Sequence, residues 1–332
     1  TIVKTSNNDT VKINAQIKIL NILLKEDTVK ALHEIKTIEY ALNSVTNKPY
    51  TFKIYEKIGR LCGYNALDQK ARYYYEIGLS KAKKEKNIEW QAKFYCRIAD
   101  FLQGADLAKQ CILYFDSAIA TAKKGDEKLY ADILMKKGRG HYDIGDYKSA
   151  MDNYIQSQRL YEKNKWRTHE FGQLLHFIGS VFKQQDFYDK ALEYYEQELV
   201  LAREIKDKAL EAEALYLCAS MYGTNGDLDK EVIYFTKAIE LYKEQNNLGM
   251  VGLMYSNLSA NSSDRKDYKT AVDYCLKAID IFEKVGNTEG IATTYRNLGT
   301  LHTTLGQPKK ALEYLKKAMD YAMKIETKQL LN

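Results

Sequence analysis

The sequence predicts an all-α solenoid of about eight helix-turn-helix repeats, and three observations lead to this fold class. A pair of small residues 12 positions apart recurs about every 40 residues, from Gly59 and Ala71 to Gly299 and Ala311. Of the 332 residues, 45% are apolar, which is ample for a buried core. Only two prolines occur in the whole chain, so long helices meet few interruptions.

The small residues mark the two helices of each repeat, and we expect them to let the second helix cross the first closely. A glycine inside a helix costs about 1 kcal/mol relative to alanine, so its recurrence needs a packing reason. Glu231 breaks the pattern in the sixth repeat and Lys137 interrupts the apolar stripe of the fourth, so both repeats are expected to pack less tightly. The first-helix sites are Gly59, Ala99, Gly138, Gly179, Ala219, Ser259 and Gly299, and the second-helix sites are Ala31, Ala71, Cys111, Ala150, Ala191, Glu231, Ala271 and Ala311.

Apolar positions and turns then place the repeats in order. An aromatic residue or leucine stands four residues before each first-helix site, as at Tyr55 and Leu175, which makes one apolar stripe on each helix. The segments "GDY" at 145–147, "GDL" at 226–228 and "GQP" at 306–308 predict turns between helices. After a leader or linker at 1–10, the predicted array covers 11–326, in repeats at 11–47, 48–86, 87–125, 126–166, 167–207, 208–247, 248–287 and 288–326.

The last six residues, 327–332, match the start of a further first helix in the 40-residue phase. A solenoid normally ends in a helix with a polar outer face. We therefore expect the chain to be a piece of a longer protein, with its next repeat truncated.

The spacing of these positions resembles the tetratricopeptide repeat, with aromatic or leucine, leucine, glycine, tyrosine and alanine at the family's relative positions. The repeats are longer than the usual 34 residues, as in the branch typified by kinesin light chains and spindle-orientation adaptors. More weakly, the opening segment "NNDTVKINAQIKILNILLKEDTVKALHEIKTIEYAL" resembles the repeat regions of bacterial sensor histidine kinases and related helix-turn-helix regulators. The resemblance implies a right-handed superhelix whose first helices line a concave groove.

Groove residues follow from the helical phase, at three and two residues before each small site and one and four after it. Asn257 and Asn297 match the asparagine that, in long-repeat adaptors, hydrogen-bonds the backbone of an extended peptide. A carboxamide can donate and accept, which suits a peptide unit, although solvation of an exposed helix face explains the same residues. The ligand-binding candidates are Asn257, Asn297, Arg296, Ser256, Thr300, Tyr216, His176, Lys183, Tyr142, Arg139, Arg97 and Arg60. Their N-terminal members are more cationic, which suits either an acidic ligand or internal ion pairs.

Composition and motifs argue against several other classes of protein. A net charge of +6, mixed along the chain, is too weak to predict nucleic-acid binding. Five cysteines lack CxxC spacing and are read as core residues. No P-loop, GxSxG or HExxH motif is present. His169 and His176 share a helix side, but we expect no acidic or cysteine partner beside them, so no metal, cofactor or catalytic residue is predicted.

The predicted function is therefore a non-catalytic protein- or peptide-binding scaffold, the input region of a larger bacterial signalling protein. The alternative is a free-standing cytoplasmic adaptor or peptide-pheromone receptor, and a less favoured third reading is an RNA-binding helical repeat. The partner is expected to be a protein or an extended peptide in the groove, without membrane insertion of this segment. An extracytoplasmic location is expected for the full-length protein, with a cytoplasmic one as the alternative.

Overall fold

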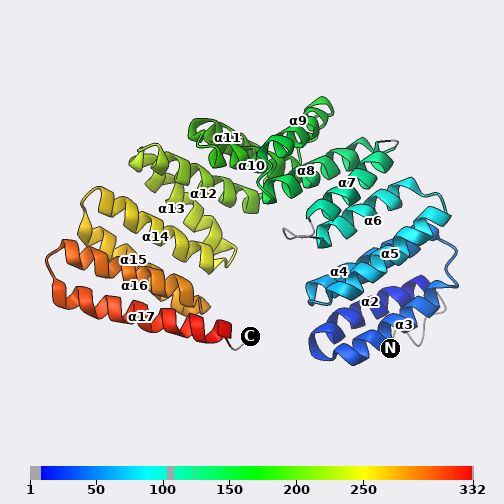
Figure 1. Cartoon of the computed structure of the whole chain (residues 1–332), viewed down its shortest axis with the longest axis horizontal. Helices are drawn as coiled ribbons and strands as arrows, with labels where there is room; N and C mark the ends of the chain where they lie inside the picture. Colours follow the sequence, from blue (N-terminus) through cyan, green and yellow to red (C-terminus); the bar gives the residue numbers. More distant parts are fainter. Residues whose placement is uncertain (1–8, 103–107, 124, 331–332) are drawn as a thin grey trace. The chain divides into compact units, whose positions relative to one another are not determined.

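The structure, a computed structural model, describes residues 9–102, 108–123 and 125–330 of the chain. Its secondary structure in this part is entirely α-helical, in sixteen helices that follow one another as antiparallel pairs (Figure 1). The helices are α2 (Asp9–Glu26), α3 (Thr28–Leu42), α4 (Lys48–Tyr64), α5 (Asp68–Lys84), α6 (Ile88–Phe101), α7 (Ala108–Ala122), α8 (Glu127–Asp143), α9 (Tyr147–Lys163), α10 (His169–Gln184), α11 (Tyr188–Glu204), α12 (Lys208–Thr224), α13 (Leu228–Glu244), α14 (Leu248–Asp264), α15 (Tyr268–Val285), α16 (Thr288–Thr304) and α17 (Pro308–Leu330).

The predicted all-α fold of about eight helix pairs is confirmed, while the first pair begins at Asp9 and the last ends at Leu330, outside the predicted bounds of 11–326. The expectation of a new helix from residue 327 is wrong within the described residues, because α17 continues unbroken to Leu330. The sequence explains the continuation. The preceding repeat turns at Gly286 and caps its next helix with Asn287, whereas Glu326 and Thr327 stand one period later. Most of the predicted leader, residues 1–8, lies outside the described residues.

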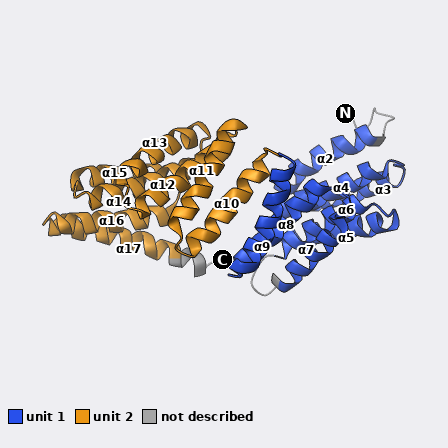
Figure 2. Cartoon of the chain, turned by 90° about the horizontal axis from the view of Figure 1, so that it is seen from above, with its two compact units in different colours: residues 1–165 blue, residues 166–332 orange. Residues whose placement is uncertain are grey.

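The chain divides into two compact units, residues 1–165 and 166–332, shown in different colours in Figure 2. Within each unit the two helices of a pair pack against each other. First helices of neighbouring pairs are also in contact. In unit 1, α4 contacts α6, and in unit 2, α10 contacts α12. The first helices therefore share one face of each unit.

The recurring glycines have a more specific role than the close helix crossing that the sequence predicted. A Cβ built on Gly59 would lie 2.4 Å from the ring of Tyr75, and one on Gly179 would lie 2.6 Å from the ring of Tyr195. Both rings come from the second helix of the same pair and are almost fully buried. Glycine in the first helix thus makes room for an aromatic side chain of the second.

The two departures from the pattern are accommodated by polar contacts. The Glu231 carboxylate fills the space above Gly223, where a Cβ would meet it at 2.6 Å, and accepts a hydrogen bond from Asn261 Nδ2 at 2.7 Å. Lys137 forms an ion pair with Asp116 at 2.7 Å. Looser packing of these two repeats stays a prediction.

Candidate functional site

Three first helices of unit 1 bring five cationic side chains together beside one cavity. Each of α4, α6 and α8 begins at an Asx cap: Asn47 Oδ1 accepts from Tyr50 N and Asn87 Oδ1 from Trp90 N, both at 3.0 Å, and Asp126 caps α8. These caps satisfy N–H groups at the helix start and fix where each helix begins. The helical period then brings residues three and four apart onto one face.

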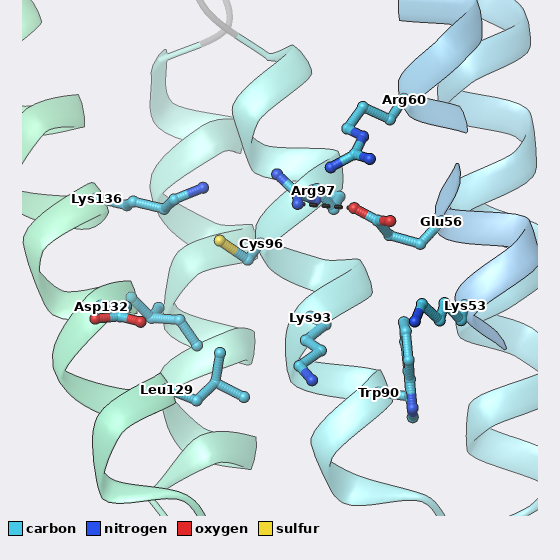
Figure 3. A pocket seen from close by; sticks show the side chains of 11 residues that line it. Lys53, Glu56, Arg60, Trp90, Lys93, Cys96, Arg97, Leu129, Asp132 and Lys136 are labelled. Atoms are coloured by element: carbon cyan, nitrogen blue, oxygen red, sulfur yellow. Dashed lines mark ion pairs between the residues drawn. The ribbon is translucent and has the colours of Figure 1, made fainter. Parts of the chain in front are cut away.

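A cavity of about 530 Å³ lies across this face (Figure 3). Its apolar surface comes from Trp90 of α6, Cys96 of α6, and Leu129 and Ile133 of α8. Around it stand five cationic and two acidic side chains, namely Lys53, Arg60, Lys93, Arg97 and Lys136, with Glu56 and Asp132. The lining therefore favours a ligand that combines apolar surface with negative charge.

Three of the five cations are already paired inside the protein, and two of these pairs join neighbouring first helices. Arg97 Nη2 lies 2.7 Å from Glu56 Oε1, the contact drawn in Figure 3, and Lys136 Nζ lies 2.7 Å from Asp100 Oδ2. Burial opposes the charge of Arg97, but the neighbouring carboxylates of Glu56 and Asp100 hold its pKa above the usual value. Both side chains therefore remain charged at neutral pH.

Arg60 and Lys53 are exposed, and within the described part of the chain no carboxylate lies at ion-pair distance from either. The Arg60 guanidinium points toward the Arg97–Glu56 pair (Figure 3). Lys93 pairs with Glu89 one turn earlier, and its Nζ lies 4.9 Å from the centre of the Trp90 ring. The cavity thus offers two uncommitted cations beside an aromatic surface.

Sequence reasoning placed Arg60 and Arg97 at this face, and both line the cavity. It missed Lys53, Trp90 and Lys93, which lie one or two turns nearer the helix starts. Continuing the same phase by three residues toward each N-terminus would have found Lys53 and Lys93, and continuing it by six would have found Trp90. Arg139 lines a separate cavity of about 260 Å³ with Lys136 and Asp143.

The other predicted residues of the N-terminal and central repeats are distributed over several environments. Tyr142 is half-buried against Tyr147, with ring centres 5.5 Å apart. Tyr216 packs on Phe235 at 6.0 Å, and burial raises its pKa. Lys183 lies half-buried near the end of α10. These side chains do not line the unit 1 cavity.

In the C-terminal repeats, Asn257 and Asn297 are half-buried and line neither of the cavities described for unit 1 and the α16–α17 pair. Ser256 is within 3.5 Å of Thr294 Oγ1, and Thr300 donates to the Arg296 carbonyl at 3.2 Å. Arg296 lines an apolar cavity of about 540 Å³ between α16 and α17. Binding of a peptide backbone by the two asparagines stays a prediction.

The expectation that no acidic residue accompanies the histidines of α10 is wrong. His169 Nδ1 lies 2.7 Å from Asp207 Oδ2, and His176 Nδ1 lies 3.6 Å from Glu213 Oε1 and 3.8 Å from Glu198 Oε2. The acids come from α11, α12 and the turn between them. Their sequence separation from the histidines hid these contacts.

The five cysteines are free and buried, as expected for core residues. Burial raises the pKa of the Cys62 and Cys111 thiols to about 11 and that of Cys96 to about 12. Thiols with such values are protonated at neutral pH and are weak nucleophiles. Among the described helices, none combines the length and the hydropathy of a membrane-spanning segment.

Stacked helix pairs whose first helices share one face define a helical-repeat protein, in which each repeat contacts only its neighbours. Residues 170–244 and 251–324 match the family model described as tetratricopeptide repeat. Within unit 2, these two segments are tetratricopeptide repeats. No curated protein matches the sequence of the chain.

Solved structures share the fold at low sequence identity. A signal transduction ATPase with numerous domains and a tetratricopeptide repeat sensor, from Pyrococcus horikoshii, is similar with a TM-score of 0.74 and 16% identity, over 98% of this chain and 49% of that one. This chain therefore spans about half of that protein. The apo quorum sensor NprR from B. thuringiensis is similar with a TM-score of 0.63 and 16% identity, over 96% of this chain and 90% of that one. The Rap conjugation gene regulator of plasmid pLS20, in complex with the Phr* peptide, is similar with a TM-score of 0.55 and 14% identity, over 94% of this chain and 96% of that one.

Proposed function

We propose that this chain is a peptide- or protein-binding scaffold, and that the unit 1 cavity takes an extended segment bearing carboxylates and an apolar side chain. The observation that carries the proposal is the cavity on α4, α6 and α8, with uncommitted cations beside an aromatic surface. Arg60 can hold a carboxylate through two parallel N–H donors. Trp90 offers a flat surface for an apolar or aromatic side chain.

The similar structures support a peptide receptor more than the input region of a sensor kinase. One is a quorum sensor and another holds a peptide, and both match this chain over nearly their whole length. The tetratricopeptide repeat sensor of the signal transduction ATPase supports the input-region reading, over about half of that protein. A place in a larger signalling protein, an extracytoplasmic location and the absence of catalysis stay predictions.

The test uses the intrinsic fluorescence of Trp90. The chain has two tryptophans, and replacing the other, Trp166→Phe, leaves Trp90 as the sole indole. Linear peptides are first selected from a display library for binding to this chain. Each selected peptide is then titrated into the Trp166→Phe variant. We expect the selected peptides to be rich in Asp or Glu and to change the Trp90 emission. Arg60→Glu should weaken their binding by about 10- to 100-fold, the effect of losing a charge-assisted hydrogen bond of roughly 1.5 to 3 kcal/mol.

Arg159→Glu is the matched control, since Arg159 is also an exposed arginine of unit 1 but lies on the second helix α9. Its binding should equal that of the parent chain. Selected peptides without acidic residues, or equal losses in the two charge reversals, contradict the proposal. If Asn257→Ala with Asn297→Ala abolishes binding while Arg60→Glu does not, the peptide site lies in unit 2.

A further inference from the structure

Three successive helices of unit 2 bring a histidine and two carboxylates together. His176 comes from α10, Glu198 from α11 and Glu213 from α12, and one potential ligand atom from each lies within 4.8 Å of the others. These three helices pack on one another, so the cluster lies where they meet within unit 2. Neither the peptide proposal nor the unit 1 cavity involves it.

Glu198 is the unusual member of this cluster. Its side chain is fully buried, and neither carboxylate oxygen has a hydrogen-bond partner in the described structure. In other repeats the same position of the second helix holds a buried alanine, such as Ala118, Ala238 or Ala278. Burying a carboxylate without a partner is costly, and buried charges in proteins are normally paired or bound to a metal. Burial, with the nearby Glu213 carboxylate, raises the pKa of Glu198 well above its usual value.

The distances within the cluster differ from those of the chain's ordinary histidine–acid pairs. His169 and His141 approach their carboxylates to 2.7 and 3.1 Å, which are hydrogen-bond distances. His176 Nδ1 stays 3.6 Å from Glu213 and 3.8 Å from Glu198. Ligand atoms about 2.1 Å from one metal ion stand roughly 3.0 to 3.4 Å apart in octahedral or tetrahedral coordination. A small inward movement would bring the three atoms onto one ion.

We propose that His176, Glu198 and Glu213 bind one divalent transition-metal ion. One imidazole nitrogen and two carboxylate oxygens form a donor set suited to Zn²⁺ or Mn²⁺. The ion would neutralise the buried Glu198 carboxylate and join α10, α11 and α12. Metal binding thereby couples to the stability of unit 2.

The test is metal binding to the whole chain, purified after chelator treatment. We expect calorimetric titration with MnCl₂ and with ZnCl₂ to give one saturable site per chain. Mn²⁺ is included because it prefers oxygen and imidazole ligands to thiols, so the five cysteines do not imitate the site. Saturating metal should also raise the melting temperature of the chain.

Glu198→Gln and His176→Ala should each lower the affinity at least tenfold and abolish the melting shift. Glu198→Gln is nearly isosteric and removes a buried carboxylate, so this variant should fold, and circular dichroism checks that it does. His169→Ala is the matched control, because it removes a histidine of α10 that pairs with a single carboxylate. It should keep full metal affinity. The proposal is overturned if the parent chain shows no saturable site, or if folded Glu198→Gln binds as tightly as the parent.

Discussion

At the scale of single residues, the identity of the small first-helix residue follows the side chain that lies on it. Where the second helix presents tyrosine, the first has glycine, and where it presents phenylalanine, the first has alanine. The tyrosine pairs are Gly59–Tyr75, Gly138–Tyr154 and Gly179–Tyr195, and the phenylalanine pairs are Ala99–Phe115 and Ala219–Phe235. At the three tyrosine pairs, a Cβ built on the glycine would lie only 2.4 to 2.6 Å from the ring. The glycine's helix penalty is therefore tied to one aromatic ring.

The pairing predicts a compensating double substitution. Gly179→Ala should lower the free energy of unfolding by about 1 to 3 kcal/mol, because its Cβ would lie 2.6 Å from the Tyr195 ring. Gly179→Ala with Tyr195→Phe should recover part of this loss, since it recreates the alanine–phenylalanine pair. Urea denaturation measures all three. Gly249→Ala, at a helical glycine with an open surrounding, should instead stabilise by up to about 1 kcal/mol. If the double variant loses as much free energy of unfolding as the two single variants together, the pairing is contradicted.

At the scale of the helix, the connections share one backbone device. A positive φ follows the first helices α4, α8, α10, α12, α14 and α16, as at Asp186, and it follows most second helices, as at Asn246. The predicted turn glycines 145, 226 and 306 occupy this position with φ of 79°, 82° and 67°. Lys266 adopts 62° at the equivalent position. The left-handed conformation is unfavourable for residues with a Cβ.

Lys266→Gly should therefore stabilise unit 2 by roughly 0.5 to 1 kcal/mol, since glycine adopts this backbone conformation without steric cost. Lys266 is exposed, so little side-chain packing is lost. Gly226→Ala, at the same position of the preceding repeat, is the reciprocal test and should destabilise by a similar amount. Urea midpoints of the two variants should move in opposite directions. A shift in the same direction would refute this account of the turns.

At the scale of the whole molecule, aspartate caps recur in both units and should govern its behaviour in acid. The Lys30 N–H lowers the pKa of Asp27, and the Ser149 hydroxyl and N–H lower that of Asp146. Asp227 and Asp267 are lowered in the same way by Lys230 and Thr270. A depressed folded-state pKa gives stability above the unfolded value near 3.9 that is lost as pH falls through the folded value.

We therefore expect the melting temperature to fall steeply as the pH is lowered below about 4. Burial raises the pKa of Glu231 and Glu198. A raised carboxyl pKa makes the folded state less stable as the pH rises above the unfolded value, so these two groups add nothing to the loss of stability in acid. Asp227→Asn is the informative variant, because asparagine caps other helices here, as Asn247 does, without titrating. The melting temperature of this variant should fall less at low pH than that of the parent chain. A melting temperature constant down to pH 3 would argue against the caps.

The sequence alone determined the period, the helix pairs, the turn positions and the side of each first helix that faces its neighbours. These follow from local chemistry, since small residues, caps and glycines act within one repeat. Two residues of the basic cavity, Arg60 and Arg97, were predictable for the same reason. Tertiary structure decided that Lys53, Trp90 and Lys93 also reach this cavity and that Glu198 and Glu213 meet His176. Helical phase gives the direction of a side chain about its own axis, whereas contacts between helices depend on how far along the axes neighbouring repeats are offset.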